Sequence, residues 1–370
     1  MNEFRFAVPC LFGLEGIAAD ELRRLNMQSV NAENGRVLFS GTALDLARAN
    51  INLATGERVT ILVGEGRADT FDRLFELVKA MPWEQYITKD GRFPVTGHAL
   101  NSKLFSVPDC QKIIKKAIAV KLTEKYGNTL HPENGAEFRV RFSIMNDTAS
   151  LMIDTSGAGL HKRGYRPVSV AAPLRETLAA AMVRVARFRG REALCDPFCG
   201  SGTIAIEAAL AAKNRAPGLS RSFTAETWSN IPADVWSAAR DEAKSREYSG
   251  NYDIWGGDID ASCVEKATAN AKRAGVSDVV RFEQADARTF KPTAGSGIVI
   301  TNPPYGERVM EHADAERLYS EFGAATKALR DWKLFLLSSH TEFERSFGRK
   351  AVKKRKLYNG MIKCDLFMYY

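Results

Sequence analysis

The second half of the chain alternates short apolar strands with helices, and this order most restricts the fold. Helices joined to strands at this spacing are typical of a doubly wound, mainly parallel sheet. We therefore predict an α/β domain here, with candidate ligand contacts where its strands end. The expected strands are 193–196, 252–257, 279–284, 297–301 and 333–338, and the expected helices are 174–188, 203–212, 262–274 and 315–329.

The first strand ends in a glycine-containing loop, Asp196-Pro197-Phe198-Cys199-Gly200-Ser201-Gly202-Thr203, which opens the next helix. Glycine lets the backbone turn tightly and approach a ligand, and amides at a helix start add donors. We expect Asp196 to be an exposed carboxylate that can pair with a ligand ammonium. By itself the Gly-Ser-Gly turn would also fit an ordinary strand-to-helix loop.

The next two strands also end in carboxylates. In Gly256-Gly257-Asp258-Ile259-Asp260, an acidic residue can accept two hydrogen bonds from a ribose diol. Asp258 and Asp260 could instead be helix caps, and we expect one of them to be a cap. Asp286 ends the following strand, where a carboxylate suits an adenine amino group. The long spacing between Gly202 and Asp258 indicates an insertion, roughly 214–247, of unassigned role.

The fourth strand is followed by Thr301-Asn302-Pro303-Pro304-Tyr305-Gly306. The prolines fix the backbone and withhold two amide donors, so that carbonyl oxygens face outward. The Asn302 amide oxygen and the Pro303 carbonyl then form a pair of acceptors that suits an exocyclic amino group. Tyr305 offers a flat ring on which a base can stack.

The first half is predicted to be α+β. Asn34-Gly35 is a tight-turn signal for a hairpin, and Thr42 can cap a helix that runs to Asn52. A segment punctuated by glycine and proline, 156–173, indicates a linker between the halves. We expect the second half to fold without Met1–Ser156. The expected strands are 4–10, 29–32, 36–40, 59–63, 93–99, 137–144 and 149–154, and the further helices are 15–25, 71–80 and 108–125.

Positive charge is clustered along the chain. The 52 lysines and arginines exceed the 44 acids, for a net charge of +8. Six lysines lie between positions 103 and 125, and seven basic residues and no acid lie between 349 and 363. Clusters of this kind favour a polyanion such as nucleic acid, because each neutralised phosphate releases counterions. The alternative is solvated helix faces and a soluble tail.

Other classes of protein are disfavoured by the sequence. No run of 18 apolar residues predicts a membrane span, and no secretory signal is recognisable. None of the six cysteines forms a CxxC pair, so a zinc site or other metal centre and a disulfide framework are not expected. We therefore expect a cytoplasmic protein with reduced thiols.

Taken together, the four strand-end motifs look like class I methyltransferases that use S-adenosylmethionine (SAM) to methylate amino groups, over residues 174–370. The rest of the chain is similar to RNA guanine-N2 methyltransferases that carry a THUMP domain, including those acting on bacterial 23S rRNA or tRNA. The segments that carry this resemblance are Cys10–Glu15 with Glu21-Leu22, Ser102–Cys110, Asp154–Gly157, Leu160–Arg166, Ala172–Glu176 and Arg355–Gly360.

The resemblance implies a ferredoxin-like segment at 1–60, a THUMP RNA-binding domain at 61–156, a basic linker at 157–173 and a Rossmann-like methyltransferase domain at 174–370. It implies catalysis by Asn302, Pro303, Pro304 and Tyr305. SAM would be held by Asp196, Pro197, Gly200, Ser201, Gly202, Thr203, Asp258, Ile259, Asp286, Ala287 and Asn302. Structured RNA would contact Lys103, Lys112, Lys115, Lys116, Lys162, Arg163, Arg166, Lys353, Lys354 and Arg355.

The expected reaction is methyl transfer to the exocyclic N2 of a guanosine in 23S rRNA or tRNA, by a monomer. The target base would have to be extruded from its stack to reach the pocket. Two alternatives remain. One is methylation of another amino group, such as adenine N6 in DNA or RNA or a protein glutamine. The other is an RNA-binding assembly factor without catalytic activity.

Overall fold

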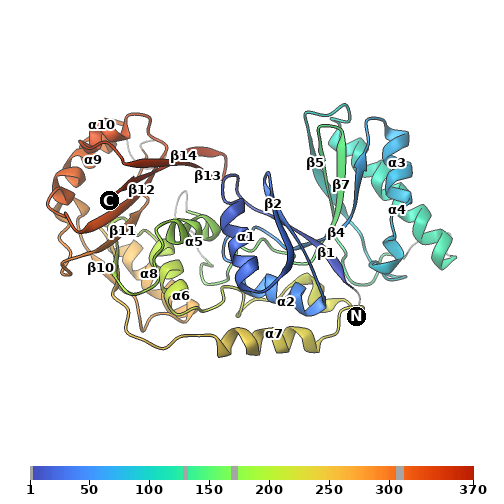
Figure 1. The fold of residues 1–370 in the computed structure, drawn as a ribbon, viewed down its shortest axis with the longest axis horizontal. Coiled ribbons are helices and arrows are strands. Elements are labelled where there is room, and N and C mark those ends of the chain that lie inside the picture. The colour runs from blue at the N-terminus through green and yellow to red at the C-terminus, as the bar shows by residue number, and fades with distance from the viewer. Residues whose placement is uncertain (1–2, 128–131, 168–173, 306–311) are drawn as a thin grey trace.

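The computed structural model describes residues 3–127, 132–167, 174–305 and 312–370. Two seven-stranded sheets lie at opposite ends of an elongated molecule, with the first half of the chain at one end and the last strands at the other (Figure 1). Each sheet carries its own helices. The predicted division into an α+β front half and an α/β second half is confirmed.

The front sheet has the order β2-β3-β1-β4-β7-β6-β5. β4 pairs with β1 on one side and with β7 on the other, so the two front units share one continuous sheet. The bounds are β1 (Phe4–Pro9), β2 (Gln28–Glu33), β3 (Arg36–Gly41), β4 (Thr60–Arg67), β5 (Val95–Leu100), β6 (Val140–Met145) and β7 (Thr148–Asp154), with α1 (Glu15–Arg24), α2 (Ala43–Asn52), α3 (Phe71–Lys79), the short η1 (Trp83–Gln85) and α4 (Val107–Tyr126).

Two local signals in this half act as predicted. Asn34 and Gly35 form the turn between β2 and β3, and Gly35 has a φ of +76°, which favours glycine. Thr42 caps α2: its side chain accepts from the Asp45 amide, while the Asp45 carboxylate accepts from the Thr42 amide.

The second sheet has the order β10-β9-β8-β11-β12-β14-β13. Its first five strands pair in parallel, β14 runs antiparallel to β12, and β13 forms the edge. The bounds are β8 (Ala193–Asp196), β9 (Ile254–Asp258), β10 (Arg281–Gln284), β11 (Gly297–Thr301), β12 (Trp332–Ser338), β13 (Lys353–Asn359) and β14 (Ile362–Tyr369), with helices α5 (Glu176–Val185), α6 (Thr203–Ala212), α8 (Ala261–Ala274), α9 (His312–Thr326) and α10 (Phe343–Phe347).

The basic segment near residue 355, for which a soluble tail was the alternative to a nucleic-acid contact, forms the hairpin of β13 and β14. The sequence did not predict β13 because its lysines do not resemble a typical strand. An edge strand can carry such charges, whereas a central strand cannot. Leu357 is the one buried residue of this strand, whereas Lys353, Lys354 and Lys356 are exposed.

The insertion belongs to the front half's core. Its helix α7 (Asp234–Ser245) packs on α2, where Arg48 Nε lies 2.6 Å from a Glu242 carboxylate oxygen. Trp228 stacks on Phe138 at 4.7 Å between ring centroids and donates from Nε1 to the Glu137 carbonyl. Removing Met1–Ser156 would therefore expose buried aromatic surface, which argues against the expectation that the second half folds alone.

The segment expected as a basic linker is partly buried between the halves; its residues 168–173 lie outside the described part of the chain. The Arg163 side chain is 2% exposed, lies 3.4 Å from Glu207 of α6, and donates to the Leu160 and Ala54 carbonyls. Tyr165 donates to the same Glu207 carboxylate at 3.1 Å. This segment therefore fastens the front half to α6.

Two of the predicted RNA contacts are consequently wrong. Arg163 is enclosed, and Arg166, 9% exposed, lies 3.1 Å from Glu176 and donates to the Thr203 hydroxyl. A guanidinium enclosed by carboxylates and carbonyls cannot also meet a phosphate. Lys162, between them in sequence, is exposed. Sequence alone could not distinguish the enclosed Arg163 and Arg166 from the exposed Lys162, because the two arginines are enclosed by Glu207 and Glu176 from other segments.

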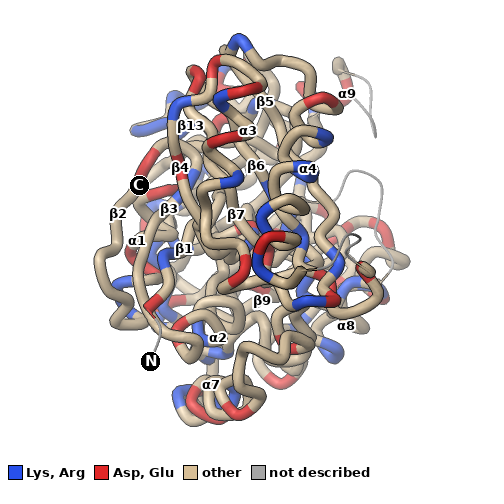
Figure 2. Tube along the Cα trace, turned by 90° about the vertical axis from the view of Figure 1, so that its right-hand side faces the viewer, with Lys and Arg blue, Asp and Glu red and all other residues tan. Residues whose placement is uncertain are grey.

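The four predicted RNA-contacting lysines of the front half lie on or next to α4, at the end of the molecule away from the second sheet (Figure 1). Basic residues recur along this helix (Figure 2). Lys112 and Lys116 are exposed; Lys103 lies 3.4 Å from Asp69 and Lys115 lies 2.8 Å from Glu133. Exposed ion pairs of this kind are weak, so these lysines can still meet phosphates.

Replacing Arg163 should destabilise the protein much more than replacing its neighbour Lys162. Arg163→Ala leaves Glu207 buried without its cationic partner, which costs about 3–5 kcal/mol. Lys162→Ala removes an exposed side chain and should change the free energy of unfolding by less than about 0.5 kcal/mol. Chemical denaturation of both variants measures the difference, and equal stabilities would contradict the assigned role of Arg163.

The insertion should contribute to front-half stability through Trp236, which is 2% exposed and stacks on Phe223. Trp236→Ala should lower the free energy of unfolding by about 3–5 kcal/mol, because it leaves a large cavity. Ser237→Ala, at an exposed position of the same helix, is the control. Hydrogen exchange should show the loss of protection in α2; unchanged exchange there would mean that α7 is not part of this core.

Candidate active site

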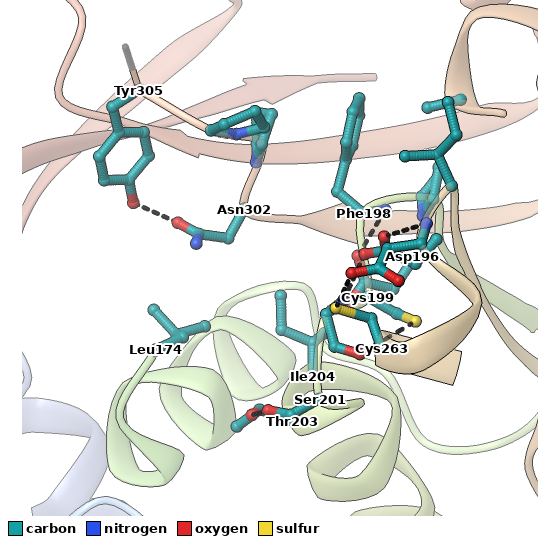
Figure 3. A pocket seen from close by; sticks show the side chains of 18 of the residues that line it. Leu174, Asp196, Phe198, Cys199, Ser201, Thr203, Ile204, Cys263, Asn302 and Tyr305 are labelled. Atoms are coloured by element: carbon teal, nitrogen blue, oxygen red, sulfur yellow. Dashed lines mark hydrogen bonds between the residues drawn. The ribbon is translucent and has the colours of Figure 1, made fainter. Parts of the chain in front are cut away.

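All four strand-end motifs line one cavity of about 1190 Å³ (Figure 3). They meet because parallel strands place their carboxyl ends along the same edge of the sheet. The cavity is larger than the roughly 300–1000 Å³ typical of a single small-molecule site, so it has room for a second group. The predicted residues that line it are Asp196, Pro197, Gly200, Ser201, Thr203, Asp258, Ile259, Asp286, Ala287, Asn302, Pro303, Pro304 and Tyr305.

The glycine turn depends on Gly202, which is not a lining residue itself. Its φ is +81°, and a Cβ there would lie 2.8 Å from the Phe282 ring and 2.9 Å from the Ala267 side chain. Only glycine therefore allows α6 to begin this close to β10 and α8. At Gly200 a Cβ would meet nothing within 4 Å, so the backbone there borders open space.

Asp196 is buried rather than exposed, which corrects the prediction; it is 1% accessible. One carboxylate oxygen accepts from the Thr301 hydroxyl at 2.6 Å and from the Phe198 amide at 3.3 Å. The other, Oδ2, has no hydrogen-bond partner among the described residues. Burial raises the pKa of Asp196 to about 7. A buried carboxylate oxygen left unpaired beside a cavity is suited to a cationic ligand group.

Asp258 and Asp260 were each considered as a helix cap or as a ligand acceptor, and the structure distinguishes them. Asp260 is the cap of α8 and accepts from the Ser262 amide at 2.8 Å, as expected for one of the pair. Asp258 accepts from the Gly200 amide at 2.8 Å, which ties β9 to the glycine turn, and from the Asp260 amide. Ile259, between them, leaves 61% of its surface exposed at the cavity.

Asp286 is held by Arg288, a cavity-lining residue that sequence reasoning missed. The Arg288 guanidinium donates to both Asp286 carboxylate oxygens at 2.6–2.9 Å. The ion pair with Arg288 lowers the pKa of Asp286. Asp286 also accepts from the Arg288 amide and so begins the short helix η3 (Ala287–Thr289), which fixes Ala287 beside the cavity.

In the Asn-Pro-Pro-Tyr segment, the Tyr305 hydroxyl donates to the Asn302 amide oxygen (Figure 3). Tyr305 also packs on the core of the second half, and burial raises its pKa. Tyr319 of α9 donates to the Pro304 carbonyl at 2.5 Å, which holds the segment from behind. The predicted acceptor on Asn302 is therefore engaged by the protein itself in this conformation, although its side chain borders the cavity.

Further lining residues come from segments to which the sequence assigned no site. They are Leu174 and Arg175 before α5, Asp314, Arg317 and Leu318 on α9, and Asn359, Gly360 and Met361 at the tip of the β13–β14 hairpin. An Asn-Gly pair is a turn signal, and it could have identified this tip. The positions on α9 carry no such signal.

The donor set fits SAM. An unpaired carboxylate oxygen on Asp196 suits an ammonium, an open glycine turn suits a close approach of the amino-acid part, and Asp258 and Ile259 offer an acceptor and an apolar surface to a nucleoside. In the described residues, no three His, Cys, Asp or Glu side chains are grouped so that they could hold a metal ion. No described helix combines the length and apolar character needed to cross a membrane.

Models of three known domain families match the chain in order: "RlmL ferredoxin-like domain" over 5–60, "THUMP domain" over 68–154, and "RMKL-like, methyltransferase domain" over 163–367. YpsC of Bacillus subtilis, an RNA methyltransferase by name, is 43% identical over 100% of this chain and 97% of its own length. The large-subunit rRNA methyltransferase K/L of Syntrophotalea carbinolica is 33% identical over 96% of this chain, which spans about half (52%) of that relative.

Solved structures agree in fold. SMU.472, a methyltransferase by name that was crystallised with S-adenosylhomocysteine (SAH), is 40% identical with a TM-score of 0.93 over 100% of this chain and 98% of its own. A Listeria monocytogenes protein named as a predicted N6-adenine-specific DNA methylase is 45% identical with a TM-score of 0.94, over 100% and 97%. The SAH complex of SMU.472 supports SAM as the cofactor of this chain.

These matches cover the whole chain in a single order of domains. They agree with the fold and with SAM as the cofactor. The chain therefore belongs to the THUMP-containing, RlmL-like family of class I, SAM-dependent RNA methyltransferases.

Proposed function

We propose that this protein transfers a methyl group from SAM to the exocyclic N2 of a guanosine in large-subunit rRNA or tRNA. One observation carries the proposal: the amino-group acceptors Asn302 and Pro303 line the same cavity as the unpaired oxygen of Asp196. A cofactor ammonium on Asp196 and a target amine on Asn302 would thus share one cavity. The THUMP domain supports RNA as the bearer of that amine.

Within this proposal, each strand end holds one part of the cofactor. Asp196 Oδ2 would accept from the ammonium, and the turn from Gly200 to Thr203 would hold the amino-acid part. Asp258 would accept from the ribose, Ile259 and Ala287 would offer apolar surface to the adenine, and Asp286 would accept from its amino group. SAM supplies an electrophilic methyl group on a positively charged sulfur.

Asn302 and the Pro303 carbonyl act on the target base. By accepting a hydrogen bond from each of the two amine N–H groups, they orient the nitrogen lone pair toward the methyl group. These hydrogen bonds also offset part of the free-energy cost of withdrawing that lone pair from the ring. Positioning and electrostatics are the main catalytic contributions. The proton can leave after transfer, so a strong general base is not needed. The Tyr305 hydroxyl occupies one lone pair of the Asn302 oxygen, and the target amine would donate to the second lone pair or displace the hydroxyl.

RNA is positioned by exposed basic residues in two regions. Lys103, Lys112, Lys115 and Lys116 lie on or next to α4, whereas Lys162 lies in the segment between the halves and β13 leads to the hairpin tip that lines the cavity. Their phosphate contacts would orient the RNA without reading its sequence. A folded RNA long enough to touch both regions fits this arrangement better than a short strand. We further propose a monomer that acts in the cytoplasm.

Adenine N6 remains a second candidate, because the same pair of acceptors suits that amine and because a 45% identical protein is named for it. Incubation with tritiated SAM and separate pools of tRNA, rRNA, DNA and protein distinguishes the substrates. Nucleoside mass spectrometry of the labelled pool then identifies the base. We expect N2-methylguanosine in RNA; label confined to DNA or protein would overturn the proposal, and label in none of them would favour an assembly factor.

Asn302→Ala should abolish methyl transfer without loss of cofactor binding. The loss of an oriented acceptor should lower the rate by about 100-fold or more. Isothermal titration should find SAH affinity within a factor of about two of the original protein, since Asn302 faces the target rather than Asp196. Asp196→Ala, the comparison variant, should lose SAH binding as well. Full activity of Asn302→Ala would refute its role.

Asp196→Asn should stabilise the protein above pH 7 while weakening SAH binding. Folding raises the pKa of Asp196 from the ordinary 3.8 to about 7, so the folded state binds more protons than the unfolded state between these values. The carboxylate therefore destabilises the fold increasingly as pH rises from about 4 to 7, a cost that asparagine lacks.

Thermal melting of the two proteins at pH 5 and pH 8 measures this difference, which should be larger at pH 8. The SAH affinity of the original protein should decline as pH falls below 7, because the ammonium needs the charged carboxylate, while that of Asp196→Asn stays weak at both values. Tight SAH binding by Asp196→Asn would contradict the ammonium contact.

A further inference from the structure

The turn of the β13–β14 hairpin presents an apolar side chain at the cavity. Asn359 pairs with Ile362, so Gly360 and Met361 form a two-residue turn, and Gly360 has a φ of +66°. Glycine at the first position of such a turn matches the right-handed twist of the strands. Met361 is 99% exposed and lines the same cavity as Asn302.

This side chain is held in place by a rigid support. Leu357, Cys364 and Leu366 of the hairpin are buried in the core of the second half. Arg355 donates to the Gly13 carbonyl at 2.6 Å, which joins the hairpin to the front half as well. Single exposed apolar residues are common and need no function. Met361 differs from such residues because it is almost fully exposed, lines the candidate active-site cavity and lies on a turn that is anchored to the core.

The hairpin also touches the target-binding segment. The Cys364 sulfur lies 3.8 Å from the Tyr305 hydroxyl, which in turn donates to Asn302. The hairpin is therefore connected to the Asn302 acceptor through two contacts, the first from Cys364 to Tyr305 and the second from Tyr305 to Asn302. The tip and the acceptor pair border one cavity, so Met361 and Asn302 both line the space that a target base would enter.

Charge on the hairpin suits RNA. Lys353, Lys356 and Lys363 are exposed and have no ion pair with any described residue, whereas Lys354 pairs with Glu344. Asp365 is the one acid in the sequence of the two strands. Lysines on an edge strand also discourage strand pairing between molecules, but that role does not explain an apolar residue at the tip between them.

We propose that Met361 is a wedge that enters the base stack of the RNA when the target guanosine is extruded into the cavity. Apolar side chains inserted between bases stabilise unstacked nucleic acid, and extrusion of a base costs a few kcal/mol. An unbranched methionine can adapt to the space that a purine leaves. The hairpin lysines would hold the flanking phosphates. This inference rests on the proposed RNA methylation.

The test compares Met361→Ala and Met361→Leu with Val352→Ala. Val352 is also an exposed apolar residue, next to β13, but does not line the cavity. The substrate is the tRNA or rRNA pool that the original protein labels from tritiated SAM, and then a transcript carrying the mapped guanosine. Met361→Ala should lower kcat for methyl transfer by roughly tenfold or more, as expected when part of the extrusion cost is no longer offset.

Further measurements separate a wedge from a structural role. SAH affinity and melting temperature should change little in Met361→Ala, since the side chain is exposed, and most of the RNA affinity should remain, because phosphate contacts supply much of it. A 2-aminopurine beside the target should become less fluorescent in the variant complex than in the original one, because the base stays stacked. A transcript with a mismatch opposite the target should restore the rate, and Met361→Leu should retain at least about half of it.

Original rates for Met361→Ala, an equal loss in Val352→Ala, or no rescue by the mismatch would overturn the wedge while leaving RNA methylation in place. If the original protein labels no RNA, the proposed function fails first and the wedge fails with it.

Discussion

The buried pair of Arg163 and Glu207 is the interaction on which the arrangement of this molecule depends. Glu207 lies on α6, the helix that the glycine turn begins. Arg163 contacts it from the segment between the halves and also donates to the Ala54 carbonyl of the front half. A buried charge needs its partner, so the segment cannot move away without a large cost. The RNA-binding front half is thereby held at a fixed position relative to the cofactor-binding edge.

The same reasoning explains why Asp196 is costly for the fold and useful for the site. Its unpaired oxygen sits where desolvation disfavours charge, so the folded protein tolerates rather than favours this carboxylate. A cationic cofactor group would relieve that cost on binding. Elsewhere along the cavity, the Asn302 oxygen accepts from the Tyr305 hydroxyl and can also accept from a substrate amine. Asp196 and Asn302 thus both have hydrogen-bonding capacity that a ligand can use.

Much of the site could be predicted because its residues follow strands in sequence. Asp196, Asp258, Asp286 and Asn302 were each identified by position after an apolar strand, and the structure brings them to one cavity. The errors concern environment. Asp196 was expected to be exposed, and Arg163 was expected at the surface; in both cases burial comes from residues distant in the chain, Thr301 and Glu207, which local patterns do not reveal.

By itself, the sequence determined most of the strands and helices, although not β13 and β14, and which polar residues end the central strands, since hydrophobic period and turn chemistry act over a few neighbouring residues. Only the tertiary structure decided that the insertion around Trp236 completes the front half's core, that the basic segment between the halves is buried, and that Met361 borders the cavity. Each of these depends on contacts between residues far apart along the chain, and such contacts exist only after packing has selected one arrangement.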